Sequence, residues 1–289
     1  MTVTYVRVFD KYEEHYRKPL STVDYRFGDF GNRGLLAEAL VDIDTVFHLI
    51  NTTLPKTSND DPAYDVQTNV IETLYLLEQC AANKIGKIIY TSSGGTIYGN
   101  PVELPIREDS PTNPECSYGI TKLTVEKYLA LFNHLYGLNY AVVRPSNPFG
   151  PRQNPNGIQG AISVFLGKVA KGEAIEIWGD GEIVRDYIFI DDLIDGIYRA
   201  AVTDTPSKTF NLGSGEGKSL NEIVAEIRTI TKTNVVVKYT GKRSFDVPRI
   251  VLDIQAAQNQ LLWKPVTPFH KAMEATWEFV KMWQESRLK

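Results

Sequence analysis

The chain has little that would point to a secreted, membrane-spanning or nucleic-acid-binding protein. Only two of its 289 residues are cysteines, Cys80 and Cys116, and their spacing suggests neither a disulfide framework nor a metal site. No secretory signal is evident, and no apolar run approaches the roughly 18 residues that a membrane-spanning helix needs. The formal net charge of -4 gives no support to a nucleic-acid partner. We therefore expect a cytoplasmic protein without metal, membrane or nucleic acid among its ligands.

Strand and helix patterns alternate along the chain, and hydrophobic residues make up 43% of it, enough for a sizeable core. Alternation of this kind predicts a doubly wound parallel α/β sheet. After residue 150 the sequence becomes richer in loops, so we expect one domain over 1–150 and a smaller lobe over 151–289, with about 188–213 returning to the main sheet. Strands are predicted at 5–10, 44–49, 85–91 and 139–144, and helices at 69–82, at 118–136 ending at Gly137, and at 268–285.

The most informative segment runs from Ser117 to Lys122. Tyr118 and Lys122 are four residues apart, so a helix places them on one face. A neighbouring ammonium stabilises a phenolate, and we expect Lys122 to lower the pKa of Tyr118 from its free value of about 10. Such a tyrosine can take a proton from a sugar hydroxyl near neutral pH. The plain alternative is a tyrosine and a lysine on a solvated helix surface.

An apolar strand lies on either side of this segment. The first ends in Ser92 and Ser93, followed by glycines, and the second leads into Asn147. Ligands bind outside the carboxyl ends of the strands in an open parallel sheet. We therefore expect the hydroxyls, Asn147 and the Tyr118–Lys122 pair to converge on one crevice.

These blocks, in this order, resemble the extended short-chain dehydrogenase/reductase superfamily, and within it the NAD-dependent nucleotide-sugar epimerases of the UDP-glucose 4-epimerase type. The resemblance continues through residues 178–181, 184–188 and 243–248, and covers nearly the whole chain. It implies a Rossmann-like sheet with a smaller α/β substrate lobe, NAD as cofactor and a nucleotide sugar, in particular a UDP-sugar, as substrate. It also implies a homodimer formed by the helices that begin at Asn69 and Tyr118.

One block of the family's pattern has no counterpart. The family normally begins with a strand, a glycine-rich turn and a helix, whereas this sequence opens at the segment 5–10, which resembles the family's second strand. About 25 residues of the pattern are thus absent. A misassigned start, a natural deletion and an engineered truncation are the alternatives. The missing strand would be central, so we expect low stability or added self-association from the exposed edges.

The resemblance assigns roles to individual residues. For catalysis it implies Tyr118 as acid and base, Lys122 as its partner and ligand of the nicotinamide ribose, and Ser93, with Thr96 as a substitute, as the bridging hydroxyl. The candidates for cofactor binding are Asp10, which would hold the adenosine ribose, together with Asp29, Phe30, Leu49, Asn69, Tyr118, Lys122 and Pro145. The candidates for substrate binding are Asn147, Trp178, Arg185, Arg243 and Asp246. The alternative readings are a loop cap for Asp10, a helix N-cap for Asn69 and a core position for Trp178.

The predicted reaction is NAD-dependent epimerisation at C4 of a UDP-hexose or UDP-N-acetylhexosamine through a transient 4-keto sugar. Ile250 occupies a position where epimerases restricted to plain hexoses carry tyrosine, which favours tolerance of N-acetylated sugars. A dehydratase is disfavoured because Gly94 and Gly95 replace its acidic pair. A decarboxylase, a keto-reductase and a catalytically inactive sugar-nucleotide-binding relative remain open.

Overall fold

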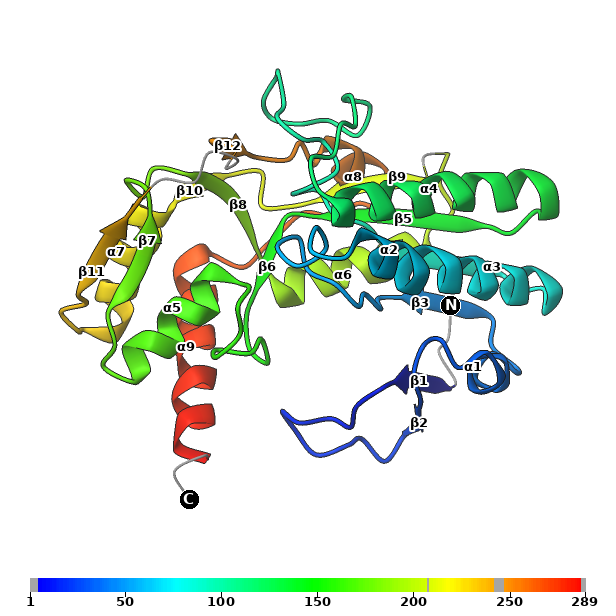
Figure 1. Ribbon diagram of the computed structural model, residues 1–289, viewed down its shortest axis with the longest axis horizontal. Helices are drawn as coiled ribbons and strands as arrows, with labels where there is room; N and C mark the ends of the chain where they lie inside the picture. Colours follow the sequence, from blue (N-terminus) through cyan, green and yellow to red (C-terminus); the bar gives the residue numbers. More distant parts are fainter. Residues whose placement is uncertain (1–4, 207, 242–246, 287–289) are drawn as a thin grey trace. The chain divides into compact units, whose positions relative to one another are not determined.

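The computed structural model describes residues 5–206, 208–241 and 247–286 (Figure 1). Two predicted substrate ligands, Arg243 and Asp246, lie outside the described residues. The strands are β1 Val6–Asp10, β2 Val23–Phe27, β3 Thr45–His48, β4 Lys87–Thr91, β5 Tyr140–Pro145, β6 Asn147–Phe149, β7 Ile175–Trp178, β8 Val184–Phe189, β9 Thr209–Leu212, β10 Gly217–Ser219, β11 Val237–Thr240 and β12 Arg249–Ile250. The helices are α1 Arg33–Ala39, α2 Pro62–Asp65, the π-helix η1 Val66–Ile71, α3 Glu72–Ala82, α4 Ser117–Tyr136, α5 Ala161–Ala170, α6 Ile190–Val202, α7 Leu220–Thr231, α8 Gln255–Gln260 and α9 Phe269–Ser286.

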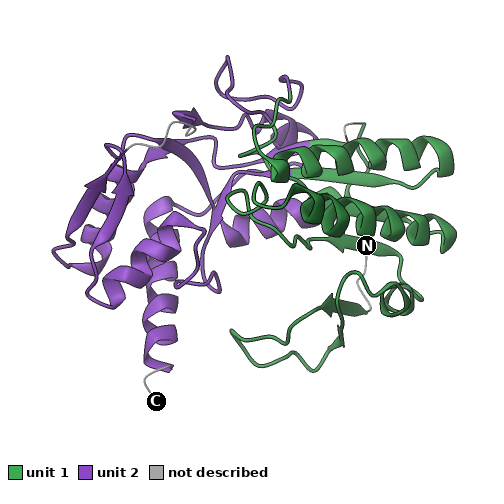
Figure 2. Cartoon of the chain, in the orientation of Figure 1, with its two compact units in different colours: residues 1–97, 112–143, 200–209 green, residues 98–111, 144–199, 210–289 purple. Residues whose placement is uncertain are grey.

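The chain divides into two compact units, coloured separately in Figure 2. Unit 1 comprises residues 1–97, 112–143 and 200–209, and unit 2 comprises 98–111, 144–199 and 210–289. Both units are built from segments that are discontinuous in the sequence, and the chain passes from one to the other several times. Among the described residues, no helix combines the length and the apolar character needed to cross a membrane.

The strands of unit 1 form parallel ladders. β3, β4 and β5 are neighbouring parallel strands of one sheet, whose fourth strand, β9, belongs to unit 2 except for Thr209. A second sheet pairs β1 with β2. β4 is buried along its centre at Ile88, Ile89 and Tyr90, as expected for a strand covered on both faces. The core of this unit joins that strand to α3 and α4 through Leu77, Cys80 and Leu129 (Figure 1).

No ladder joins β1 to β3 within the described part of the chain, so the sheet of unit 1 is divided in two. Side chains beside this break are unusually exposed for apolar residues, with Val6 at 43%, Val8 at 36% and Phe47 at 43%. On β1 the exposed residues alternate with Arg7 and Phe9, so one face of the strand is covered and the other is bare.

The helix that contains Tyr118 has the predicted limits. It begins at Ser117 and ends before Gly137, which adopts a left-handed conformation with φ 70° and whose N–H donates to the carbonyl of Asn133. The predicted helix from Asn69 differs, because helical structure already starts at Pro62 and passes through the π-helix η1 before α3. Asn69 therefore lies inside a helical run, and the reading of this residue as an N-cap is wrong.

Unit 2 has its own sheets and its own core. β8 is the centre of one sheet and pairs with β6, β10 and β12, while β7 pairs with β11. The core gathers apolar side chains from α5, α7 and α9, including Leu166, Ile223 and Met273. The terminal helix predicted at 268–285 is found as α9.

Candidate active site

The first turn of α4 positions Tyr118 and Lys122. An α-helix leaves its first N–H groups without internal acceptors, and here a loop supplies them: Asn59 Oδ1 accepts from the N–H of Ser117 at 2.9 Å and Ser58 Oγ accepts from that of Tyr118 at 3.0 Å. Ser58 is fully buried, so its hydroxyl is held in place by the protein interior, whereas Asn59 is exposed. The beginning of the helix, and with it the orientation of Tyr118, is therefore fixed.

Lys122 lies on the same face one turn later, as its spacing from Tyr118 predicted. Its Nζ is 5.6 Å from the centre of the Tyr118 ring and 4.9 Å from that of Tyr90. The ammonium donates a hydrogen bond to the carbonyl oxygen of Thr91, at the end of β4, at 2.8 Å. Lys122 is 4% exposed, so the reading of a solvated surface pair does not hold for this residue.

The ionisation of the pair differs from the expectation. Burial raises the pKa of Tyr118 to about 12, and nearby Cys116 and Asp65 act in the same direction. Burial also lowers the pKa of Lys122 to about 7, against the opposing effect of two carboxylates, Asp65 and Glu126. Desolvation disfavours the charged form of each group and is the largest cause of both shifts. Lys122 can assist Tyr118 as an ammonium only if neighbouring charge keeps it protonated.

A loop rich in hydroxyls follows β4. Ser92 donates to Glu126 at 2.5 Å, and the hydroxyl of Thr96 is buried without a hydrogen-bond partner. Gly119 lets α4 approach this loop closely, because a Cβ at that position would lie 2.8 Å from the carbonyl oxygen of Thr96. Ser93, which is partly buried, stands between these two residues in the sequence. An unpartnered buried hydroxyl suits a polar ligand such as a sugar hydroxyl.

Two buried acids in this region were not singled out from the sequence. Asp65 is fully buried and accepts hydrogen bonds from Ser117 at 2.6 Å and Thr121 at 3.3 Å, while Glu126 is held by Ser92. A weak signal existed in the sequence, because Glu126 lies one helical turn beyond Lys122. The contacts of Asp65 join residues about 50 positions apart and had no local signal.

The candidates for cofactor binding lie in unit 1, apart from Pro145, which is buried in unit 2. Asp10 is exposed at the end of β1 and accepts a hydrogen bond from the N–H of Tyr12 at 2.9 Å, so it does cap a loop. Asp29 forms an ion pair with Lys11 at 2.9 Å, which holds the pKa of its carboxyl below the usual value. Leu49 is exposed after β3.

Phe30 and Asn69 are buried instead of open to a ligand. The ring of Phe30 packs 5.4 Å from that of His48, whose pKa burial lowers to about 3. The amide of Asn69 donates to Thr52 and Asp65, both at 2.9 Å, and accepts from the N–H of Thr52 at 3.0 Å. Their predicted roles toward the cofactor remain predictions, and their structural contacts explain why these residue types occur here.

The described substrate candidates belong to unit 2. Asn147 on β6 donates from Nδ2 to the carbonyl oxygen of Asp186 on β8 at 3.0 Å. Arg185, also on β8, donates to the carbonyl oxygens of Val184 at 2.9 Å and Val247 at 2.7 Å. Trp178, at the end of β7, is 45% exposed, so it is not a core residue. Adjacent strands thus bring Asn147 and Arg185 into one sheet.

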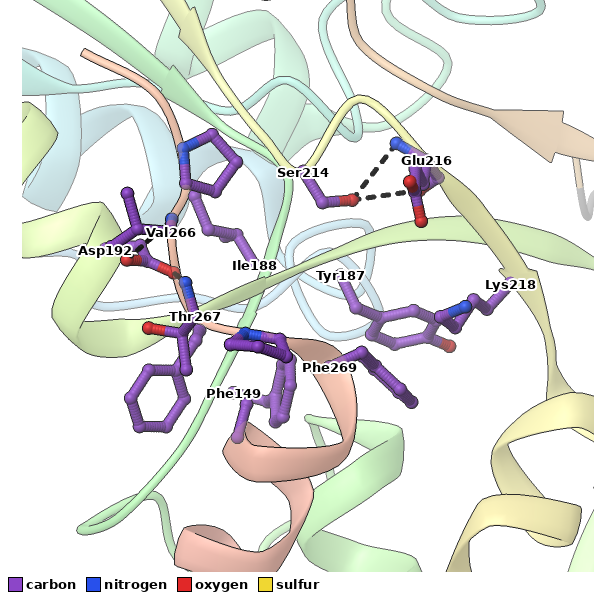
Figure 3. A pocket seen from close by; sticks show the side chains of 14 residues that line it. Phe149, Tyr187, Ile188, Asp192, Ser214, Glu216, Lys218, Val266, Thr267 and Phe269 are labelled. Carbon is purple, nitrogen blue, oxygen red and sulfur yellow. Dashed lines mark hydrogen bonds between the residues drawn. The ribbon is translucent and has the colours of Figure 1, made fainter.

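Unit 2 also contains a hollow of about 270 Å³, shown in Figure 3. Its walls come from β6, β8, the start of β10 and the segment leading into α9, and include Phe149, Tyr187, Lys218 and Phe269. The Nζ of Lys218 lies 4.8 Å from the centre of the Phe269 ring. Asn147, Trp178 and Arg185, the described residues predicted to bind substrate, do not line this hollow, so it does not define the candidate site.

A Rossmann-like parallel sheet, combined with a helix that carries a tyrosine and a buried lysine beside a strand-end hydroxyl loop, defines a class of nicotinamide-dependent enzymes acting on alcohol groups. Residues 4–213 match the model of the NAD dependent epimerase/dehydratase family, and the chain belongs to that family. The match spans most of unit 1 and part of unit 2.

Individual relatives agree with this assignment. The chain is 34% identical over 248 residues to a UDP-glucose 4-epimerase of Mycolicibacterium smegmatis, covering 86% of this chain and 79% of the relative. The crystal structure of the Thermotoga maritima UDP-glucose 4-epimerase with UDP-glucose superposes with a TM-score of 0.91 at 30% identity, over 99% of this chain and 92% of that one. A UDP-N-acetylglucosamine 4-epimerase from Methanobrevibacter ruminantium gives a TM-score of 0.85 at 29% identity, over 90% and 83% of the two chains.

These similarities confirm the family and the fold class predicted from the sequence motifs. The epimerase class and the dependence on NAD are confirmed as properties of the family to which the chain belongs. The predicted domain limits and the roles of individual residues remain predictions.

Proposed function

We propose that the protein interconverts the C4 epimers of a UDP-sugar with NAD as cofactor. The observation that supports this best is the pair of partly buried Tyr118 and buried Lys122, with Lys122 anchored on Thr91 at 2.8 Å and the unpartnered hydroxyl of Thr96 beside α4. In a chain of this family, these are the groups that proton exchange with a sugar hydroxyl needs.

The residues present fit NAD in part. The side chain of Lys122 is suited to a hydroxyl of the nicotinamide ribose, and the exposed carboxylate of Asp10 to a hydroxyl of the adenosine ribose. An acid at that strand end disfavours the extra phosphate of NADP, so NAD is the preferred cofactor. When bound, NAD would supply the reversible hydride transfer at C4 of the sugar. No residue of the described segments is assigned to the pyrophosphate.

Tyr118 takes the proton of the 4-hydroxyl as the 4-keto sugar forms. After the keto sugar has rotated to present its opposite face, Tyr118 returns the proton to the epimeric alkoxide. Lys122, as an ammonium, stabilises the phenolate, and Ser93 or Thr96 bridges Tyr118 and the sugar hydroxyl. Asn147, Trp178 and Arg185 bind the nucleotide diphosphate, because a guanidinium binds phosphate oxygens in pairs and an aromatic ring stacks on a base. Arg243 and Asp246 are proposed for the same ligand on the resemblance alone.

The first measurement is the NAD content of the purified protein, obtained by denaturing it and quantifying the released nucleotide. The second is the conversion of UDP-glucose to UDP-galactose by the wild type, Tyr118→Phe and the control Tyr128→Phe, a partly buried tyrosine on the same helix. We expect bound NAD, a loss of about 10²- to 10⁴-fold in kcat for Tyr118→Phe, and wild-type activity for Tyr128→Phe.

Absence of NAD with none taken up on addition, together with no turnover, would favour the inactive sugar-nucleotide-binding alternative. Equal activity of the two tyrosine variants would contradict the role of Tyr118. Consumption of NAD(P)H with a 4-keto sugar, without epimerisation, would instead indicate the keto-reductase alternative.

UDP-N-acetylglucosamine belongs in the same assay. Ile250 is buried on β12 and is the register partner of Arg185 on β8, and its side chain differs from the tyrosine expected of enzymes restricted to plain hexoses. We propose that the N-acetylated sugar is also accepted. Turnover of UDP-glucose with none of UDP-N-acetylglucosamine would refute this.

We further propose a cytoplasmic homodimer. One face of α4 exposes the apolar side chains of Ile120, Leu131 and Leu135. Such a group of exposed apolar residues is unusual on a helix face that contacts only solvent. Apolar residues at this spacing suit a helix-to-helix contact with a second copy. The molar mass from light scattering tests the dimer.

A further inference from the structure

Asp65 is a fully buried carboxylate that joins three separate segments of unit 1. Its Oδ1 accepts from the hydroxyl of Thr53, after β3, at 2.5 Å and from the amide of Asn69, in η1, at 2.9 Å. Its Oδ2 accepts from the hydroxyls of Ser117 at 2.6 Å and Thr121 at 3.3 Å, both on α4. A buried carboxylate without partners would be strongly destabilising, and four donors compensate this one.

The two α4 donors occupy informative positions. Ser117 directly precedes Tyr118, and Thr121 directly precedes Lys122, so Asp65 holds the same turn of helix that orients the proposed catalytic pair. The π-helix η1 begins immediately after Asp65 and places Asn69 so that its amide also reaches the carbonyl oxygen of Asp65 at 3.2 Å. Single π-helical turns occur often at functional sites.

We propose that Asp65 is a positioning residue of the active site, which fixes the start of α4 and favours the ammonium form of Lys122. Its catalytic meaning rests on the proposed function, since Lys122 stabilises a phenolate only while it is charged. Asp65 is fully buried, and its proposed effect is exerted through α4 and Lys122.

The surroundings of Lys122 agree with this role. The groups facing it are the carboxylates of Asp65 and Glu126, the rings of Tyr90 and Tyr118, and the carbonyl oxygen of Thr91. His48 is also close enough to be affected by the ammonium, and burial keeps it neutral. The two carboxylates are thus the groups that raise the pKa of Lys122 against its burial, with Asp65 the stronger.

The test is the titration of the Lys122 side chain followed by NMR on protein with labelled lysine, with the signal assigned through Lys122→Met. Asp65→Asn removes the charge and keeps the shape. Its control is Asp61→Asn, because Asp61 is an exposed acid four residues earlier that caps α2. We expect the midpoint of Lys122 to fall by about one pH unit or more in Asp65→Asn and to stay at the wild-type value in Asp61→Asn. An unchanged midpoint in Asp65→Asn would overturn the proposal.

A second variant tests the positioning role separately from the charge of Asp65. It can be measured even if Asp65→Asn does not fold. The double variant Ser117→Ala/Thr121→Val keeps the carboxylate and removes two of its hydrogen bonds to α4. We expect it to lower kcat about tenfold with KM unchanged, because the misplaced tyrosine affects the transition state more than binding. Wild-type kcat in this variant would overturn the positioning role.

The NMR titration does not depend on epimerisation, so the two proposals can fail separately. If the wild type turns over no UDP-sugar but the Lys122 midpoint falls in Asp65→Asn as predicted, the proposed function is refuted and the electrostatic role of Asp65 is supported. An active enzyme whose Lys122 titrates identically in Asp65→Asn would do the reverse.

Discussion

Lys122 lies buried between two aromatic rings and a backbone carbonyl, and its ammonium therefore loses most of its hydration. Burial lowers its pKa to about 7 from 10.5. The folded state binds the proton of this lysine more weakly than the unfolded state, so the protonated side chain costs stability. That cost is present in full below about pH 7 and is relieved as the pH rises toward 10.5.

The rise of stability with pH leads to a prediction for Lys122→Met. Between pH 7 and about 9.5 the wild type should gain unfolding free energy relative to the variant, by at most about 1.4 kcal/mol per pH unit. Urea unfolding at pH 6, 7.5 and 9 measures the difference, in which the contributions of the other titrating groups cancel. Lys127→Met, at an exposed position of the same helix, is the control and should follow the wild type. A constant difference from pH 6 to 9 would show that Lys122 is not ionised as described.

At the scale of elements, α4 shows what local sequence can specify. Its 20 residues end at a glycine in the left-handed region, where φ is 70° and a side chain would be strained. The helix was predicted around the Tyr118–Lys122 pair, and its end was predicted from Gly137. The π-helix η1 was not predicted, because the bonds that Asn69 makes to Asp65 and Thr52 decide its geometry and have no periodic signature in the sequence.

We predict that Gly137→Ala destabilises the protein by about 1 kcal/mol. No atom lies within 4 Å of a Cβ built at Gly137, so the cost would come from the backbone alone. Gly95→Ala is the matched control, because that position is equally open and φ is not in the left-handed region. Urea denaturation compares the two, and equal effects would contradict the argument.

At the scale of the whole molecule, the division between β1 and β3 leaves two strand edges without partners in the described residues. Open edges with apolar side chains pair readily with other chains. Val8 and Phe47 have exposed apolar side chains on these two strands.

We expect Phe47→Lys to suppress concentration-dependent association beyond the dimer, because a charge beside an open edge disfavours strand pairing. Sedimentation velocity over a range of protein concentrations measures this. Val236→Lys is the control, since Val236 is also exposed and apolar but belongs to unit 2. If both variants associate like the wild type, the strand edges are not the associating surface.

The sequence by itself determined the family, the parallel α/β class, and the pairing of Tyr118 with Lys122 on one helix face. These depend on residues within a few positions of each other and on the order of motifs, which local spacing expresses directly. Only the tertiary structure decided how the pair ionises and what holds it, because desolvation depends on atoms from distant segments. The bond from Ser117 to Asp65 spans 52 residues, and the break between β1 and β3 concerns strands that are not consecutive in the chain. Such contacts form only when the chain has folded.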